Sequence, residues 1–147
     1  MRPGGARYDP VPIAQRTRLV IVATEFEFDA AHNLPNYAGK CERLHGHTYR
    51  LRVLCAAPVN ASTGLAIDFA EVKRVVKASV IDVLDHTYLN ETIAVPSAEN
   101  IAIWIWDRLS ATSIPLHEVH VHETPGCFVI YRGEGADAPS KATDSGQ

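Results

Sequence analysis

The sequence lacks the features that would assign it to a membrane, to nucleic acid or to a disulfide scaffold. Its 147 residues contain no apolar run near the roughly 20 residues of a transmembrane helix. A formal net charge of −3 gives no electrostatic attraction to nucleic acid. Three cysteines are an odd number and do not form a disulfide framework. We therefore expect a protein without membrane or nucleic-acid partners, in a reducing, cytoplasmic setting.

Internal repeats and a Gly-rich phosphate loop are also absent, and the length is that of one domain with a sizeable core. The composition, 46% hydrophobic and 21% charged residues, is that of an ordinary globular protein. The beginning of the chain is rich in Pro, Gly and Arg, its end is small and polar, and neither shows hydrophobic periodicity. We expect one domain at residues 19–134, a flexible N-terminal arm at 1–18 and a disordered tail at 135–147.

Hydrophobic periodicity divides the expected domain into four strands and two helices. Alternating or β-branched segments predict strands at 19–32, 45–56, 117–124 and 127–132. Asp68 and Ser97 stand where N-caps are expected, each before apolar residues at helical spacing, which predicts one helix from Asp68 to His86 and another after Ser97. This order predicts an α+β fold: a four-stranded antiparallel sheet with both helices inserted between strands two and three. The outer strands would be open edges, so we expect a homo-oligomer.

The stretch with the most chemical content ends in His45-Gly46-His47 and is best considered together with His32. On an extended strand, His45 and His47 project from the same face. A third imidazole, from His32, would complete the three-ligand set of a catalytic zinc and leave the fourth position open. The sequence therefore predicts a zinc site.

A second His-x-His pair, His120 and His122, shows that this spacing alone is a weak signal. Val119 and Val121 alternate with these histidines and would occupy the apolar face of their strand. We therefore expect His120 and His122 to be solvent-facing sheet residues rather than metal ligands.

Cys41 lies four residues before His45 and is flanked by Lys40 and Arg43. Nearby cations and a metal favour the thiolate, which is the form that accepts a proton or attacks an electrophile. Most free cysteines are instead inert small hydrophobes, and that alternative applies to Cys55 and Cys127. Cys41 is therefore the candidate catalytic thiol.

Seven short motifs occur in an order that resembles the 6-pyruvoyltetrahydropterin synthase / 6-carboxytetrahydropterin synthase family. In chain order they are Phe28–His32, Cys41-x-x-x-His45-Gly46-His47, Gly64–Phe69, Leu84–His86, Pro96–Asn100, His122–Thr124 and Ile130–Glu134. The resemblance implies the tunnelling fold (T-fold), assembled into an oligomeric barrel that is often a hexamer of paired trimers.

The three-residue spacing between Cys41 and His45 resembles the bacterial 6-carboxytetrahydropterin synthases of the queuosine (7-deazaguanine) pathway. The resemblance implies a zinc-dependent lyase that converts 7,8-dihydroneopterin triphosphate to 6-carboxy-5,6,7,8-tetrahydropterin, acetaldehyde and triphosphate. A sibling activity is the nearest alternative: formation of 6-pyruvoyltetrahydropterin, or another side-chain cleavage of dihydroneopterin. A non-catalytic pterin-binding T-fold protein is an alternative of a different class.

The resemblance also implies a role for each candidate residue of the site. Cys41 would be the general base, and Asp85 and His86 a second acid–base pair that commonly comes from a neighbouring subunit. Zn²⁺ would be held by His32, His45 and His47.

Two further residues would bind the substrate. By resemblance, Glu123 would anchor the pterin ring and Ser97 would supply a hydroxyl near it, whereas Ala98 lacks the second hydroxyl that the family often has. Cupin metalloenzymes also carry His-x-His on a strand, but they place a Glu shortly afterwards, where this chain has Leu51 and Arg52.

Overall fold

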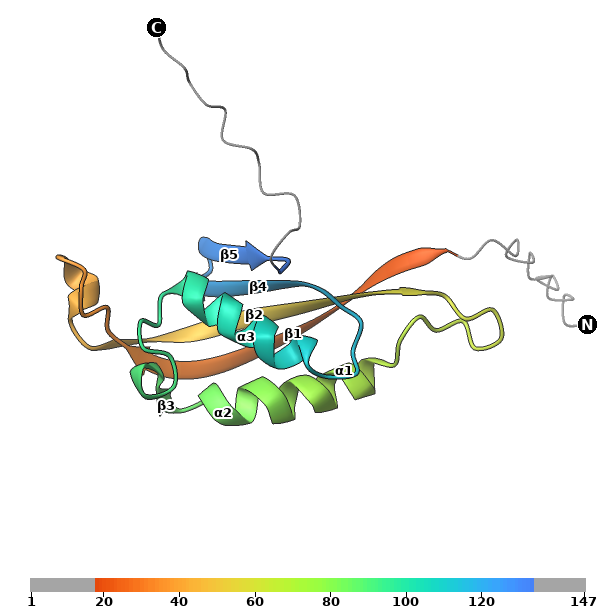
Figure 1. Ribbon diagram of the computed structural model, residues 1–147, viewed down its shortest axis with the longest axis horizontal. Coiled ribbons are helices and arrows are strands. Elements are labelled where there is room, and N and C mark those ends of the chain that lie inside the picture. The colour runs from red at the N-terminus through yellow and green to blue at the C-terminus, as the bar shows by residue number, and fades with distance from the viewer. Residues whose placement is uncertain (1–17, 134–147) are drawn as a thin grey trace, which may run out of the picture.

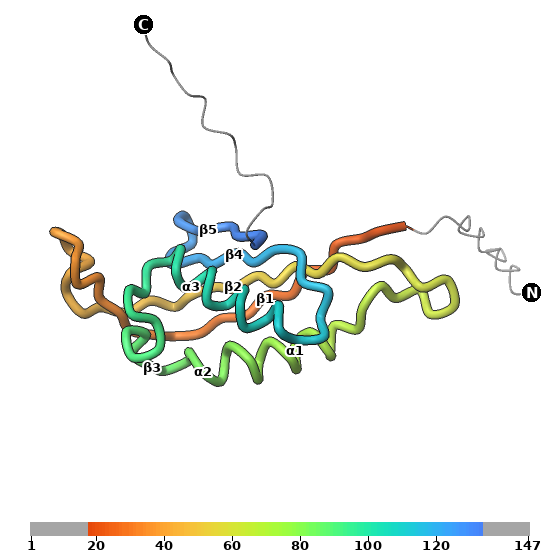
Figure 2. Tube along the Cα trace, viewed as in Figure 1, coloured from red at the N-terminus to blue at the C-terminus, as the bar shows by residue number. Residues whose placement is uncertain are grey.

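The computed structural model of the chain describes residues 18–133, which form one sheet with helices on one face (Figures 1 and 2). The expected arm and tail therefore lie almost wholly outside the described residues. The strands are β1 (Leu19–His32), β2 (His45–Pro58), β3 (Thr87–Tyr88), β4 (Leu116–Thr124) and β5 (Cys127–Tyr131). The helices are α1 (Phe69–Val76), α2 (Asp82–Leu84) and α3 (Ala98–Ser110). The predicted α+β class is confirmed.

The sheet differs from the expected four-stranded one in a single respect. Its strand order is β3-β1-β2-β4-β5, and β1, β2, β4 and β5 pair antiparallel as predicted. The additional strand, β3, pairs parallel to the end of β1, with Ala30 opposite Thr87 and Ala31 opposite Tyr88. Two residues are too few to show a period-two pattern, so sequence periodicity could not find this strand.

The helices begin at the predicted caps. The Asp68 carboxylate accepts the N–H of Ala70 at 2.8 Å, and the Ser97 hydroxyl accepts the N–H of Asn100 at 3.2 Å. The expected helix after Asp68 is interrupted by a π-helical turn at Lys77–Ile81 between α1 and α2. None of the helices within residues 18–133 has the length and apolar character needed to cross a bilayer.

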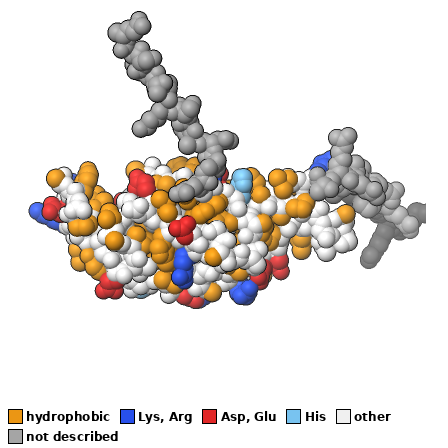
Figure 3. All heavy atoms as spheres, in the orientation of Figure 1, with side chains coloured by type: hydrophobic (Ala, Val, Ile, Leu, Met, Phe, Trp, Pro, Cys, Tyr) orange, Lys and Arg blue, Asp and Glu red, His pale blue; other side chains and the backbone are white. Residues whose placement is uncertain are grey.

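The two faces of the sheet differ in chemistry. The helix-covered face holds the core, in which alternate residues of β2 are fully buried: Tyr49, Leu51, Val53 and Cys55. The bare face carries a ladder of ion pairs, Arg50–Glu27 at 3.1 Å and Arg52–Glu25 at 2.6 Å. On the side seen in Figure 3, apolar side chains are spread over the surface and charged ones gather along the edge that α1 and α2 form. Because His45 and His47 alternate in phase with Tyr49, they continue the core row to the end of the sheet.

Candidate active site

The three histidines predicted to bind metal meet where β1 ends and β2 begins. His32 and His45 are register partners, and one ring nitrogen from each of His32, His45 and His47 lies within 4.8 Å of the other two. His32 is only 1% exposed, whereas His45 and His47 are half-buried. The antiparallel register therefore brings together residues that the loop between the strands separates in the sequence.

Main-chain carbonyls determine which ring nitrogens are available in this cluster. Nδ1 of His32 donates to the carbonyl of Pro96 at 2.7 Å, and Nδ1 of His45 donates to the carbonyl of Arg43 at 2.7 Å. Because a carbonyl only accepts, both Nδ1 atoms carry the proton, and a neutral ring then presents a lone pair at Nε2. The two Nε2 atoms lie 3.0 Å apart. Nitrogens that share a tetrahedral zinc are about 3.3 Å apart, so this pair is spaced for a common cation.

His47 supplies the third nitrogen. Its Nε2 is buried and has no hydrogen-bond partner, and the nearest acid, Glu123, places Oε1 at 3.5 Å, within ion-pair range but without hydrogen-bond geometry. Burial lowers the pKa of His47, and the charge of Glu123 opposes this only in part. A neutral imidazole with an unpartnered buried nitrogen is the form that a metal binds. The three residues therefore fit a divalent cation.

The structure does not bring every predicted site residue into this cluster. Cys41 lies half-buried in a one-turn 3₁₀ helix, Lys40–Glu42, in the loop between β1 and β2. Among residues 18–133, its sulfur does not join the histidine nitrogens in one metal-binding group. The hydroxyl of Ser97 caps α3, while Glu123 lies beside His47 and lines a cavity of about 410 Å³.

Asp85 and His86 form a second cluster with Asp29. Asp85 Oδ2 lies 3.0 Å from Nδ1 of His86, while Oδ1 accepts the N–H of Asp29 at 2.9 Å. The hydrogen bond from the Asp29 N–H, and to a smaller extent the bond from the His86 side chain, hold the pKa of Asp85 below its usual value. The Asp85 carboxylate therefore stays ionised beside the imidazole. The backbone of His86 has a φ of 58°, which costs a non-glycine residue about 1–2 kcal/mol. The His86 N–H donates to the Asp29 carbonyl at 2.6 Å and holds it there.

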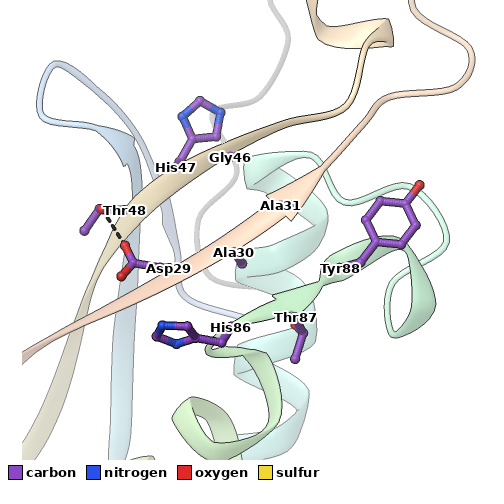
Figure 4. Close-up of a pocket in the computed structure, with 9 residues that line it drawn as sticks. All are labelled: Asp29, Ala30, Ala31, Gly46, His47, Thr48, His86, Thr87 and Tyr88. Carbon is purple, nitrogen blue, oxygen red and sulfur yellow. Dashed lines mark hydrogen bonds between the residues drawn. The ribbon is translucent and has the colours of Figure 1, made fainter.

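A cavity of about 610 Å³ reaches both clusters, and its lining includes Asp29, Thr48, His47 and His86 (Figure 4). The Thr48 hydroxyl donates to Asp29 at 2.5 Å. In Figure 4 the imidazoles of His47 and His86 lie on opposite sides of β1 and do not point toward each other. Within one chain, His86 is therefore not directed at His47.

Sequence reasoning missed the groups that hold these side chains. The carbonyls of Pro96 and Arg43, and the main-chain N–H of Asp29, position catalytic candidates without using a side chain. A main-chain group is common to every residue type, so no residue pattern marks it. The Thr48–Asp29 bond joins register partners on β1 and β2, and could have been found once the strand register was known.

The second His-x-His pair, His120 and His122, lies on the bare face of β4 as expected, but neither ring is fully exposed to solvent. His120 contacts the carboxylate of Glu118, and His122 stacks on Phe128 with 4.4 Å between ring centroids. The two rings lie on the predicted face of the strand, but the prediction that they are solvent-exposed was wrong: both are half-buried, because Phe128 of β5 stacks on His122 and Glu118 contacts His120.

We expect His122 to weaken the fold in acid. Burial, then the positive charge of Arg52, holds the pKa of His122 below its usual value. The unfolded chain therefore binds the proton first, and stability falls as the pH drops through the ordinary histidine range. In metal-free protein, the melting temperature should fall between pH 8 and about pH 5, and it should fall less in His122→Gln than in wild type. The matched variant of exposed His117, His117→Gln, should behave like wild type; equal losses in all three proteins would contradict this assignment.

Comparison with known proteins places this geometry in a family. The family model described as PTPS, 6-pyruvoyl tetrahydropterin synthase, matches residues 21–134. The 6-carboxy-5,6,7,8-tetrahydropterin synthase of Synechocystis sp. is 42% identical over 111 residues, which cover 71% of this chain and 86% of the relative. The 6-pyruvoyl tetrahydrobiopterin synthase of Dictyostelium discoideum is 34% identical, covering 80% and 99%.

Structural comparison agrees with the sequence comparison. The solved 6-pyruvoyl tetrahydropterin synthase of Caenorhabditis elegans superimposes with a TM-score of 0.73 at 30% identity, covering 80% of this chain and 98% of that one. The expected T-fold is thereby confirmed, and the cupin alternative is wrong. The chain belongs to the 6-pyruvoyl tetrahydropterin synthase family of pterin synthases.

Proposed function

We propose that the chain is a zinc-dependent 6-carboxy-5,6,7,8-tetrahydropterin synthase of queuosine biosynthesis. Its substrate would be 7,8-dihydroneopterin triphosphate, and its products 6-carboxytetrahydropterin, acetaldehyde and triphosphate. The observation that carries the proposal is the histidine cluster, in which two Nε2 atoms face each other at 3.0 Å and a third is buried without a partner. The 42% identity to the Synechocystis protein of that name supports the carboxy product.

The residues of the chain would divide the chemistry among them. His32, His45 and His47 would hold the zinc. When bound, zinc supplies Lewis acidity that makes the proton on the adjacent substrate carbon easier to remove. Cys41, as the thiolate, would accept that proton. Asp85 would orient the imidazole of His86, which would return a proton on another face of the substrate.

A second copy of the chain would complete each site. Because the imidazole of His86 does not point toward His47 of its own chain, we propose that it serves the histidine cluster of a neighbour. At its end, the outer edge of β1 is bonded to Asp85 and His86 through Asp29 and to β3 through Ala30 and Ala31; the rest of this edge pairs with no strand within residues 18–133. β1 and β5 expose large apolar side chains: Leu19, Ile21, Phe128 and Ile130. Such edges favour strand pairing between copies, consistent with a hexamer of paired trimers.

Mixed oligomers test this arrangement. Cys41→Ala and His86→Ala should each be nearly inactive alone. Co-expressed with different tags and purified as mixed oligomers, they should regain about a quarter of wild-type turnover, because one random site in four combines an intact Cys41 with an intact His86. Mixed oligomers as inactive as their parents would show that both residues act within one chain.

Glu123 is proposed to anchor the pterin ring by accepting its N–H and amino protons. We expect Glu123→Gln to raise KM roughly 10-fold to 100-fold with a smaller change in kcat, because a bond to a charged group is lost from ground state and transition state alike. Steady-state kinetics would measure both constants. The exposed Asp107 provides a control, and Asp107→Asn should change neither. An unchanged KM in Glu123→Gln would remove the anchor role.

The product decides between the two activities that relatives carry. Formation of 6-pyruvoyltetrahydropterin is the alternative, and the Dictyostelium and Caenorhabditis relatives bear names of that type. Purified protein would be incubated with 7,8-dihydroneopterin triphosphate, the pterin identified by mass, and acetaldehyde assayed with alcohol dehydrogenase. A carboxy pterin with equimolar acetaldehyde supports the proposal. A pyruvoyl pterin without acetaldehyde supports the alternative, and no conversion by zinc-loaded protein would favour a non-catalytic pterin-binding protein.

A further inference from the structure

Asn33 is the first residue after His32 and begins the loop that carries Cys41, which Figure 2 shows in orange beyond the end of the sheet. The side chain of Asn90 binds both main-chain polar groups of Asn33. The Asn33 N–H donates to Oδ1 of Asn90 at 3.1 Å, and Nδ2 of Asn90 donates to the Asn33 carbonyl at 2.9 Å. The hydroxyl of Tyr88 donates to the Asn33 side chain at 2.5 Å. The base of the loop is therefore fixed to β3, through Tyr88, and to the segment that follows β3, through Asn90.

Asn33 and the next residue, Leu34, are hydrogen-bonded to Glu42 and Cys41. Nδ2 of Asn33 reaches the carbonyl of Glu42 at 3.4 Å, and the N–H of Leu34 donates to the carbonyl of Cys41 at 2.8 Å. The remaining bonds between main-chain groups of the loop join residues three apart, such as Glu42 to Gly39. At the other end of the loop, the carbonyl of Arg43 accepts from Nδ1 of His45. Within the described residues, hydrogen bonds thus attach Cys41 to the sheet through the first two residues of its loop on one side and through Arg43 on the other.

The segment that binds Asn33, residues 85–90, also carries the second acid–base pair, Asp85 and His86. Asp85 and His86 are bound to Asp29 at one end of this segment, and Tyr88 and Asn90 are bound to Asn33 at the other. Between them, β3 pairs with the end of β1. Figure 4 shows Tyr88 and His86 on opposite sides of β3. Residues 29–33 and 85–90 therefore form one hydrogen-bonded unit.

We propose that Asn33 is a positioning residue for Cys41, held in place by Tyr88 and Asn90. Its side chain and main chain set where the thiol lies relative to the histidine cluster, while Asn33 itself contacts no reacting atom. This inference rests on the proposed function, in which Cys41 is the proton acceptor. Both the loop that carries Cys41 and the segment that carries His86 are therefore bonded to residues 29–33, the end of β1 and the residue that follows it.

Thiol alkylation measures the position of Cys41 without depending on turnover. The full chain would carry Cys127→Ser, because Cys127 is exposed and Cys55 is fully buried, which leaves Cys41 as the accessible thiol. Zinc-loaded protein would be treated with iodoacetamide and the modified peptide quantified by mass. We expect Asn33→Ala to alkylate about fivefold to tenfold faster and Tyr88→Phe about twofold to fivefold faster, as the loss of one or two net hydrogen bonds implies.

A control for general loosening comes from the opposite end of the sheet. Asn60 caps the turn after β2, where its side chain accepts the N–H groups of Ser62 and Thr63 at 2.9 and 3.1 Å. Asn60→Ala should leave the alkylation rate unchanged. In the same series, Asn33→Ala should lower kcat about tenfold, with KM within about twofold of wild type and zinc content unchanged.

Two results would overturn the positioning role. One is an alkylation rate in both Asn33→Ala and Tyr88→Phe that equals that of Asn60→Ala. The other is a kcat loss in Asn33→Ala accompanied by loss of zinc, which would place its effect on His32 instead. Tyr88→Phe removes a single hydroxyl from an exposed side chain, so it keeps the test decisive if Asn33→Ala does not fold. Failure of the proposed function can be distinguished from failure of the positioning role. If Cys41 were not the proton acceptor, Cys41→Ala would keep its turnover, while alkylation of Cys41 in the Asn33 and Tyr88 variants would still report the position of the loop.

Discussion

Replacing His45 by alanine is expected to remove the bound metal and to lower turnover by roughly three orders of magnitude or more, because Lewis-acid stabilisation is worth several kcal/mol. His45 is the best histidine of the three to test. It is half-buried, and its Nδ1 bond goes to the carbonyl of Arg43, two residues away, so its removal disturbs the core less than removal of fully buried His32. Zinc content by elemental mass spectrometry and turnover would be measured on the same preparation.

The control for His45 is another histidine of the sheet. His117 is the second residue of β4 and is exposed, so His117→Ala should retain both zinc and turnover. If His45→Ala kept a full equivalent of zinc, the cluster would not be the metal site. If it lost zinc and kept its turnover, the metal would have no catalytic role.

Cys41→Ala is expected to separate metal binding from proton transfer. Because the histidine nitrogens form their group without the Cys41 sulfur, the variant should retain its zinc. Loss of a positioned general base should lower kcat about 10²-fold to 10⁴-fold. Cys127→Ala, at an exposed thiol that begins β5, is the matched control and should be fully active. Unchanged turnover in Cys41→Ala would exclude Cys41 as the base.

The sequence predicted most of the fold, because each long element carries its own periodic signal. The strands that begin at Leu19, His45 and Cys127 start where alternation or β-branched runs begin, and Asp68 and Ser97 cap helices as their residue types suggest. What periodicity could not predict depends on tertiary contacts. β3 exists because two residues meet the end of β1, and the π turn occurs inside an apolar stripe that is compatible with an uninterrupted helix.

The metal candidates were predictable for a related reason. Strand geometry places His45 and His47 on one face, and the register then adds His32. Their orientation was not predictable, because it depends on carbonyls of Pro96 and Arg43 that any residue could supply. The direction of His86 likewise depends on main-chain bonds to Asp29 rather than on a residue pattern.

Metal removal and restoration test the central claim, that turnover depends on a cation held by His32, His45 and His47. Purified protein would be freed of metal with a chelator, assayed with 7,8-dihydroneopterin triphosphate, and titrated with zinc while zinc content and product are followed together. We expect no turnover without metal and full recovery at one zinc per chain. Full turnover by demonstrably zinc-free protein, or recovery that requires no zinc at the histidine cluster, would contradict it.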